Sequence, residues 1–390
     1  MHALGVAEGL TSTTDHEPQY ARIEGQSRRA GGRVHSFLSS RVHLYSESVV
    51  LIGRVCSRWR GVTHGCPALW TLVDVGYPGK QALAILRRCL AYSAGLPLVL
   101  RISKSITPNL NASSIDSRFM SLVAAHARRW AEISIDLSGS HDVLQPLIDL
   151  PPGSFHLLQR AHVSFYRLDR AAVSPDALLW DAILTSPRMQ SAELLKVQYT
   201  LSGLASAPLP RFTRLGLHSA EPEMVAHVIE ACPMLDTLYV SIFPPVMGDA
   251  RPLPIHRPVD LQHLRVLMLC GNTDWNPLLE NLILPNLDRL DMSRMSVHRN
   301  AVEQMLERSA ARPRMLAIHW PTVGQARDIV ALLVTSALQN LKVLRYKRCC
   351  LDLGWEGDLE LKPFVPAGIS YTTDSGEAEM AYESLQHKPR

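Results

Sequence analysis

The sequence lacks the paired ligands on which disulfide frameworks and zinc ribbons depend. Its seven cysteines are odd in number and scattered, and no C-x-x-C occurs. No H-E-x-x-H or H-x-H stands among its 16 histidines. Because such scaffolds need Cys or His at short, paired spacings, we expect reduced thiols and no metal or other cofactor. Reduced thiols fit a cytoplasmic or nuclear protein best.

A large charge excess and long apolar runs are also missing. The 40 basic and 36 acidic residues leave a net charge of +4, with no basic stripe of the kind that nucleic acid requires. The longest uncharged apolar-rich run, 329–341, is too short to span a bilayer and contains polar residues. We expect it to form a core-facing amphipathic helix. The first 30 residues carry acidic side chains and no continuous apolar segment, so no signal peptide is predicted. Partners among nucleic acids and membranes are therefore not expected.

Catalytic signatures are absent as well. The chain contains neither a G-x-S-x-G nucleophile turn nor a G-x-x-x-x-G-K-[ST] phosphate loop. Nothing singles out a pair of carboxylates for acid–base chemistry, and Cys56 is expected to be a small buried side chain without a base beside it. We expect no enzyme.

What the sequence does contain is the composition of a core-forming protein, with 46% hydrophobic and 19% charged residues. Segment 1–45 is rich in Gly, Ser, Thr and Arg without periodicity and is expected to be poorly ordered. Segment 46–75 has a helical pattern, segment 76–365 forms a repetitive body, and segment 366–390 is a polar tail expected to be disordered.

Several elements can be predicted locally. Val55, Trp59 and Val62 fall on one face of a helix that ends before Pro67. The pattern further predicts helices at 80–94 and 118–130, and strands at 96–102 and 132–137.

A repeat begins near Val163, and its leucines can be aligned from Leu194 onward. Its anchor leucines are separated by 21, 23, 29, 23, 26 and 28 residues, within or near the 20–29 of leucine-rich repeats. Segments 222–231 and 300–309 between them have the pattern of helices. One strand and one helix per unit predict an α/β fold, an irregular leucine-rich-repeat solenoid with a parallel sheet on its inner face. The anchors are Leu194, Leu215, Leu238, Leu267, Leu290, Leu316 and Leu344.

Segment 47–73 carries a composite motif, V-C-x-x-W-R followed by P-x-L-W. It resembles the second half of an F-box, and the segments that follow it look like those of F-box proteins of mushroom-forming fungi. The residues that match the family motif are Val55, Cys56, Trp59, Arg60, Pro67, Leu69 and Trp70.

The resemblance implies a substrate adaptor of an SCF (cullin–RING) ubiquitin ligase. The helical module would dock on the Skp adaptor, and the repeat body would hold an unknown protein substrate. Most of the matching residues hold the module together in the family, so Trp59 and Trp70 are expected to be core anchors. No L-P-x-E helix precedes Val55, and segment 34–38 is only a candidate for a degenerate one. The alternative is a protein-interaction scaffold whose degenerate F-box recruits no ligase.

Four aromatic residues lie in or beside predicted strands and are candidate substrate contacts. If they face the concave surface of the repeat body they can anchor a partner protein, and if they face inward they belong to the core. These residues are Tyr199, Tyr239, Trp320 and Tyr346.

Overall fold

A computed structural model describes most of the chain between residues 49 and 373. Segments 1–45 and 34–38, Tyr199, and the part 374–390 of the polar tail lie outside the described residues. The described ranges are 49–76, 79–102, 117–138, 143–166, 176–195, 207–218, 220–242, 255, 257–271, 273–321, 325–347 and 365–373.

The described residues build a mixed α/β structure around one large parallel sheet. The sheet has 12 strands, and neighbouring strands follow each other along the chain. A separate pair, β8 (Val259–Asp260) and β10 (Leu282–Ile283), lies between its members in sequence. The strands of the large sheet are β1 (Leu72–Val75), β2 (Leu98–Ile102), β3 (Trp130–Ser138), β4 (Arg160–Tyr166), β5 (Ser191–Leu195), β6 (Arg214–His218), β7 (Thr237–Ser241), β9 (Val266–Cys270), β11 (Arg289–Ser293), β12 (Met315–His319), β13 (Val343–Lys347) and β14 (Ser370–Thr373).

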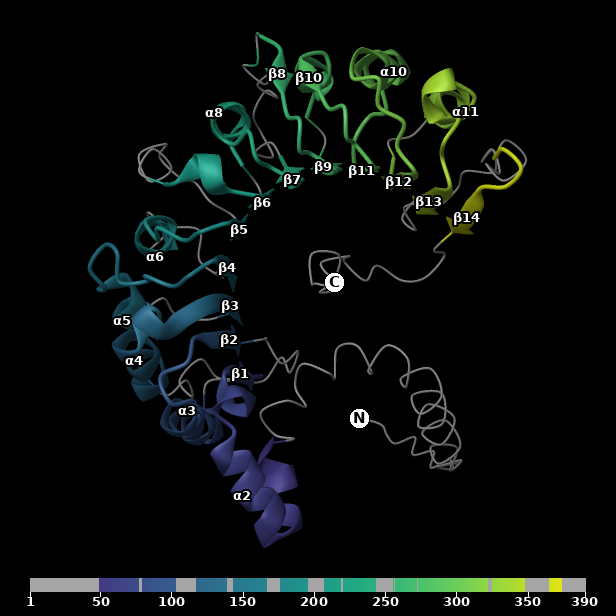
Figure 1. Cartoon of the computed structure of the whole chain (residues 1–390). Helices are drawn as coiled ribbons and strands as arrows, with labels where there is room; N and C mark the ends of the chain where they lie inside the picture. Colours follow the sequence, from purple (N-terminus) through teal and green to yellow (C-terminus); the bar gives the residue numbers. More distant parts are fainter. Residues whose placement is uncertain are drawn as a thin grey trace, which may run out of the picture.

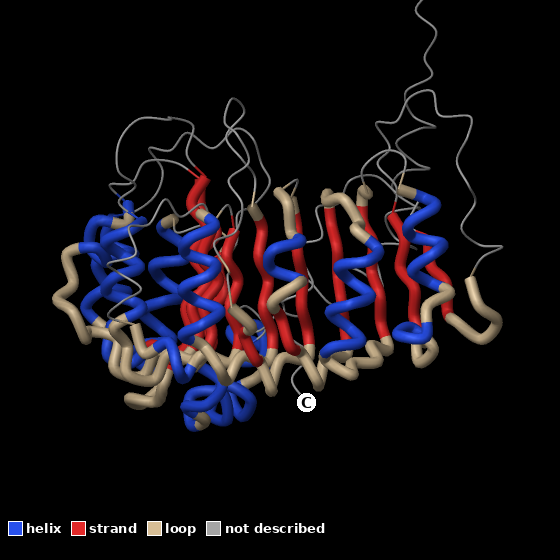
Figure 2. Tube along the Cα trace, turned by 90° about the horizontal axis from the view of Figure 1, so that it is seen from above, coloured by secondary structure: helices blue, strands red, loops and turns tan. Residues whose placement is uncertain are grey.

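Helices connect the strands and form a second layer on one face of the sheet (Figure 2). The sheet curves into an arc with its strands on the concave side and the helices on the convex side (Figure 1). The α-helices are α2 (Ser57–Gly65), α3 (Lys80–Tyr92), α4 (Ser117–Ala125), α5 (Gln145–Ile148), α6 (Asp176–Leu184), α8 (Pro222–Ala231), α9 (Asn276–Leu279), α10 (Arg299–Arg308) and α11 (Ala326–Leu333). The 3₁₀ helices are η1 (Pro67–Trp70), η3 (Ala127–Arg129), η5 (Leu209–Arg211) and η6 (Ser336–Leu338).

The core lies between the two layers and is built from side chains at alternate strand positions. In the large sheet, β2 and β3 begin earlier in the register. The other strands from β1 to β13 of that sheet point their second and fourth residues toward the helices, as the period of two in a strand requires. The six predicted anchors from Leu215 to Leu344 pair with one another in register and are buried. The leucine three residues before an anchor is also buried, at Leu235, Leu264, Leu287 and Leu341.

The predicted register at Leu194 is wrong by two residues. Leu215 pairs with Ala192, whereas Leu194 pairs with Leu217. Both positions face the core because a shift of two residues leaves a side chain on the same side of the sheet. The first repeat step is therefore 23 residues, from Ala192 to Leu215, and not 21.

Three local predictions differ from the structure. The helix expected at 118–130 ends earlier, because Trp130 opens β3 as a buried residue whose indole Nε1 donates to Val123 O at 2.9 Å. The helix through Val55 is interrupted at Cys56, which is extended (φ −160°, ψ 170°) and caps α2. Strand β14 pairs with β13 inside segment 366–390, for which the sequence predicts disorder.

Candidate binding surface

The concave face of the sheet carries the polar residues of the strands. The strand positions that alternate with the core positions point away from the helices, so they line the inner side of the arc. Those in register with the third residue of β4 form a column across the sheet, here called the central column. It runs through Asp74, Arg101, Ser134, His162, Glu193, Gly216, Tyr239, Met268, Asp291, Ala317, Arg345 and Thr372.

At the β2–β4 end of this face, one buried carboxylate holds two guanidinium groups. Glu132 Oε1 accepts from Arg101 Nη2 at 3.0 Å, and its Oε2 lies 2.7 Å from Arg160 Nη2. The Glu132 side chain is 8% exposed, whereas the two arginines reach solvent. The ion pairs on both oxygens offset the cost of burying this carboxylate, and they fix the orientation of both arginine side chains.

The middle of the face holds two imidazoles on either side of Glu193. His162 Nδ1 lies 2.8 Å from Oε2 and His218 Nε2 lies 3.0 Å from Oε1. Burial alone would raise the pKa of Glu193, but hydrogen bonds from both imidazoles and their charges lower it to about 2. Burial lowers the pKa of His162, yet the hydrogen bond and charge of Glu193 raise it overall.

The same network continues to Tyr239. Its ring lies over His218 with centroids 4.3 Å apart. Burial raises the pKa of the Cys270 thiol, so it carries little thiolate at neutral pH. Burial likewise raises the pKa values of Cys89 and Cys232 to about 12. These three buried thiols are poorly suited to act as nucleophiles.

At the β11–β13 end, two cations lie close to the ring of Trp320. The guanidinium carbon of Arg294 lies 4.9 Å from the ring centroid, and Lys347 Nζ lies 5.5 Å from it. The indole is half-buried directly after β12, and Trp320 N donates to Lys347 O at 2.7 Å. Cation–π contacts of this kind help to hold the ring in place at the end of β12.

The four aromatic residues predicted as candidate contacts therefore differ in where they lie. Tyr239 lies on the concave face, half-buried, and Trp320 is half-buried directly after β12. Tyr346 occupies the fourth position of β13, 9% exposed among core side chains, so the core alternative holds for it. Tyr199 lies outside the described residues. Sequence reasoning missed the Glu132 and Glu193 networks, whose only signal is a charged residue at a concave position in successive strands.

The F-box-like residues occupy a small helical module at the β1 end of the arc. Trp70 is buried as predicted, donates from Nε1 to Thr63 O at 2.7 Å, and lies 4.9 Å from the Tyr92 ring. Arg60 Nε donates to Gly53 O at 3.0 Å and ties the two helical segments together. Pro67 opens η1 and is half-buried.

The core roles predicted for Trp59 and Cys56 are wrong. Trp59 is 51% exposed and Cys56 is exposed, with its sulfur accepting from Trp59 N at the start of α2. The apolar side chains on both sides of Cys56 are exposed, and they are here called the apolar stripe. Six of the nine large apolar side chains that are exposed in the described ranges belong to this stripe: Leu51, Ile52, Val55, Trp59, Val62 and Leu69. Clusters of exposed apolar side chains are common at surfaces that bind other proteins.

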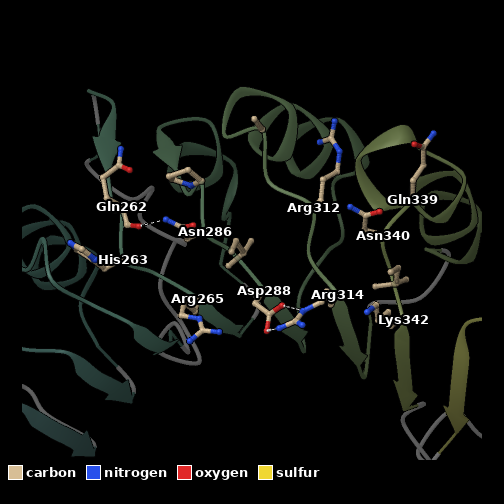
Figure 3. A pocket seen from close by; sticks show the side chains of 14 residues that line it. Gln262, His263, Arg265, Asn286, Asp288, Arg312, Arg314, Gln339, Asn340 and Lys342 are labelled. Atoms are coloured by element: carbon tan, nitrogen blue, oxygen red, sulfur yellow. Dashed lines mark hydrogen bonds and ion pairs between the residues drawn. The ribbon is translucent and has the colours of Figure 1, made fainter.

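A third feature is an open hollow of about 960 Å³ at the edge where β9, β11, β12 and β13 begin. Arg265, Asp288, Arg314 and Lys342 stand in a row along it, each one residue before its strand (Figure 3). The loops that follow β8, β10, α10 and η6 complete the lining. We call it the basic groove, since cations outnumber its single carboxylate.

Within the described ranges, no group of His, Cys, Asp and Glu side chains is arranged to hold a metal ion. The helices of that same part of the chain include none with the length and apolar character needed to cross a bilayer. No protein-family model and no curated protein matches this chain.

Proposed function

We propose that this chain is a non-catalytic substrate adaptor of the F-box type, in which segment 46–75 docks on the Skp adaptor of a cullin–RING ubiquitin ligase. Segment 76–365 is then an irregular leucine-rich-repeat solenoid that holds a protein target on its concave face. The single observation that carries this proposal is the exposed apolar stripe of residues 51–69, next to a curved surface of fixed polar groups.

Two kinds of surface support a role in binding. An apolar patch that includes a half-exposed tryptophan suits a stable protein partner, because aromatic anchors dominate the energy of interfaces. Ion pairs hold several charged groups of the concave face, around Glu132 and Glu193, so a target would meet groups there that need little reordering. Burial of the thiols at Cys89, Cys232 and Cys270 also favours binding over catalysis.

The second candidate is a protein-interaction scaffold whose degenerate F-box recruits no ligase. The sequence observation behind it is that no L-P-x-E motif precedes Val55. The interruption of the helix at Cys56 points the same way, since it divides the stripe between two helical segments.

A pull-down of the full chain with a fungal Skp adaptor separates the two. Val55→Asp places a charge at the centre of the stripe, and Val334→Asp is its matched control, because both valines are 71% exposed. The adaptor proposal expects capture by wild type and by Val334→Asp and loss of capture with Val55→Asp. A folded wild type that captures nothing refutes ligase recruitment and leaves the scaffold.

A further inference from the structure

We infer that the basic groove binds an extended acidic segment of a partner protein. This inference rests on the part of the proposed function in which the repeat body holds a protein target. It does not depend on recruitment of the ligase, because the groove lies at the β9–β13 end of the arc and the apolar stripe at the other (Figure 1).

The backbone places the groove's cations in a fixed row. Asp288 N donates to Arg265 O at 2.9 Å, Arg314 N to Asp288 O at 2.9 Å, and Lys342 N to Arg314 O at 2.8 Å. The four residues therefore continue the ladder of the sheet by one step. Adjacent strands are about 4.8 Å apart, so the backbones of Arg265 and Lys342 are separated by about 14 Å.

Some charged side chains of the row are in an ion pair and others are not. Both oxygens of Asp288 are bound by Arg314, whose Nη2 donates to Oδ2 at 2.9 Å. That fork, with the charges of Arg265 and Lys342, lowers the pKa of Asp288. Within the described residues, Arg265 and Lys342 form no ion pair. The guanidinium of Arg312 donates to the neighbouring backbone oxygen, Ala311 O. Three cations thus line the groove without a carboxylate of their own.

The size and lining of the groove favour a peptide over a nucleic acid. Its volume of about 960 Å³ lies at the upper end of ordinary ligand sites and exceeds what one small anion needs. In the described part of the chain, no Trp, Tyr or Phe lines it, so nucleobases find no surface for stacking. The amides of Gln339 and Asn340 supply donors for the carbonyl groups of a peptide (Figure 3).

The distance between Arg265 and Lys342 sets the spacing of acidic residues that the bound segment needs. An extended chain rises about 3.4 Å per residue, so acidic side chains four residues apart span about 14 Å. The groove therefore matches a segment with Asp or Glu at positions i and i+4. One carboxylate would meet Arg265 and the other Lys342, with Arg312 above the row (Figure 3).

The test is fluorescence anisotropy with the full chain and a labelled 12-residue peptide of Gly and Ser that carries Glu at positions 4 and 8. We expect saturable binding that weakens as NaCl rises, and at least about tenfold weaker binding of the same peptide with Gln at those positions. A labelled 12-nucleotide single strand is the competing probe. If the Gln peptide binds equally well, or the oligonucleotide binds more tightly than the Glu peptide, the inference is overturned.

Variants locate the site. Arg265→Glu with Lys342→Glu should abolish peptide binding, whereas the charge-matched control Arg87→Glu with Arg88→Glu, on the exposed side of α3, should keep it. Circular dichroism confirms that both are folded. Retention of binding by the folded groove variant contradicts the inference. Val55→Asp, which tests ligase recruitment, should leave peptide binding unchanged, so failure of one proposal is distinguishable from failure of the other.

Discussion

Glu193 lies beside Gly216, its partner in register on the next strand, and reaches past it to His218. A Cβ atom at Gly216 would come within 2.9 Å of Glu193 Cγ. The absence of a side chain at one position of the central column therefore makes room for the network of two imidazoles and one carboxylate on the concave face.

Gly216→Ala should displace the Glu193 side chain and cost about 1–2 kcal/mol of the free energy of unfolding, as overpacking does. The urea midpoint measures this cost. Gly61→Ala is the control, since a Cβ atom at Gly61 would meet nothing within 4 Å and alanine favours the interior of α2 by roughly 0.5–1 kcal/mol. Equal midpoints for wild type and Gly216→Ala would show that Glu193 moves aside without cost.

The stability of the Glu193 network should depend on pH. The pKa of Glu193 falls from 4.5 to about 2 on folding, so its contribution is complete above about 4.5 and lost as the pH drops toward 2. The pKa of His162 rises from 6.5, so its contribution is complete below 6.5 and lost as the pH increases through the higher folded value.

The network is accordingly most stabilising between about pH 4.5 and 6.5, by about 3 kcal/mol at most from Glu193. Urea unfolding of wild type and Glu193→Gln across pH 3–9 provides the measurement. The difference between their midpoints should peak inside that window. A constant difference at every pH would mean that the imidazoles are not coupled to Glu193.

The two tryptophans of the F-box-like module should respond differently to truncation. Trp70 is 3% exposed and hydrogen-bonded, so Trp70→Ala should cost about 3–5 kcal/mol. Trp59 is 51% exposed, so Trp59→Ala should cost less than about 1 kcal/mol. Thermal unfolding of both variants measures these two costs. A large loss of stability in Trp59→Ala would show that the Trp59 ring is part of the core.

Gly271 should tolerate no side chain. It has φ +113°, and a Cβ atom there would lie 1.8 Å from Ile242 O, in the backbone directly after β7. Gly271→Ala should cost more than about 3 kcal/mol, because strain and a backbone clash act together. Gly368→Ala shares the positive φ but meets nothing within 4 Å, so it should cost only about 1–2 kcal/mol of strain. Similar melting temperatures for the two variants would rule out the clash.

Much of the strand pattern could be predicted from the residues. The leucine pairs spaced by three residues that begin at Leu235, Leu264, Leu287 and Leu341 identify buried positions before and within the strands. The same reasoning fails at Trp130 and Trp59. Each continues a helical pattern, but the fold buries Trp130 in a strand and leaves Trp59 exposed to solvent. Whether a side chain is buried depends on which other elements pack against it, and the local sequence does not show this.

The sequence by itself determined which residues alternate between core and surface, since that follows from the period of two within each short strand. Only the tertiary structure decided which polar residues meet. His162 and Glu193 are 31 residues apart and Glu193 and His218 are 25 apart, with a helix or loop between them. Their contact depends on the register between strands, and the error of two residues at Leu194 shows why that register escapes the sequence. The connections between strands differ in length, so the local sequence does not show which residues of two strands pair. A shift of two residues keeps the same side chains buried, but it changes the partner of every residue on the next strand.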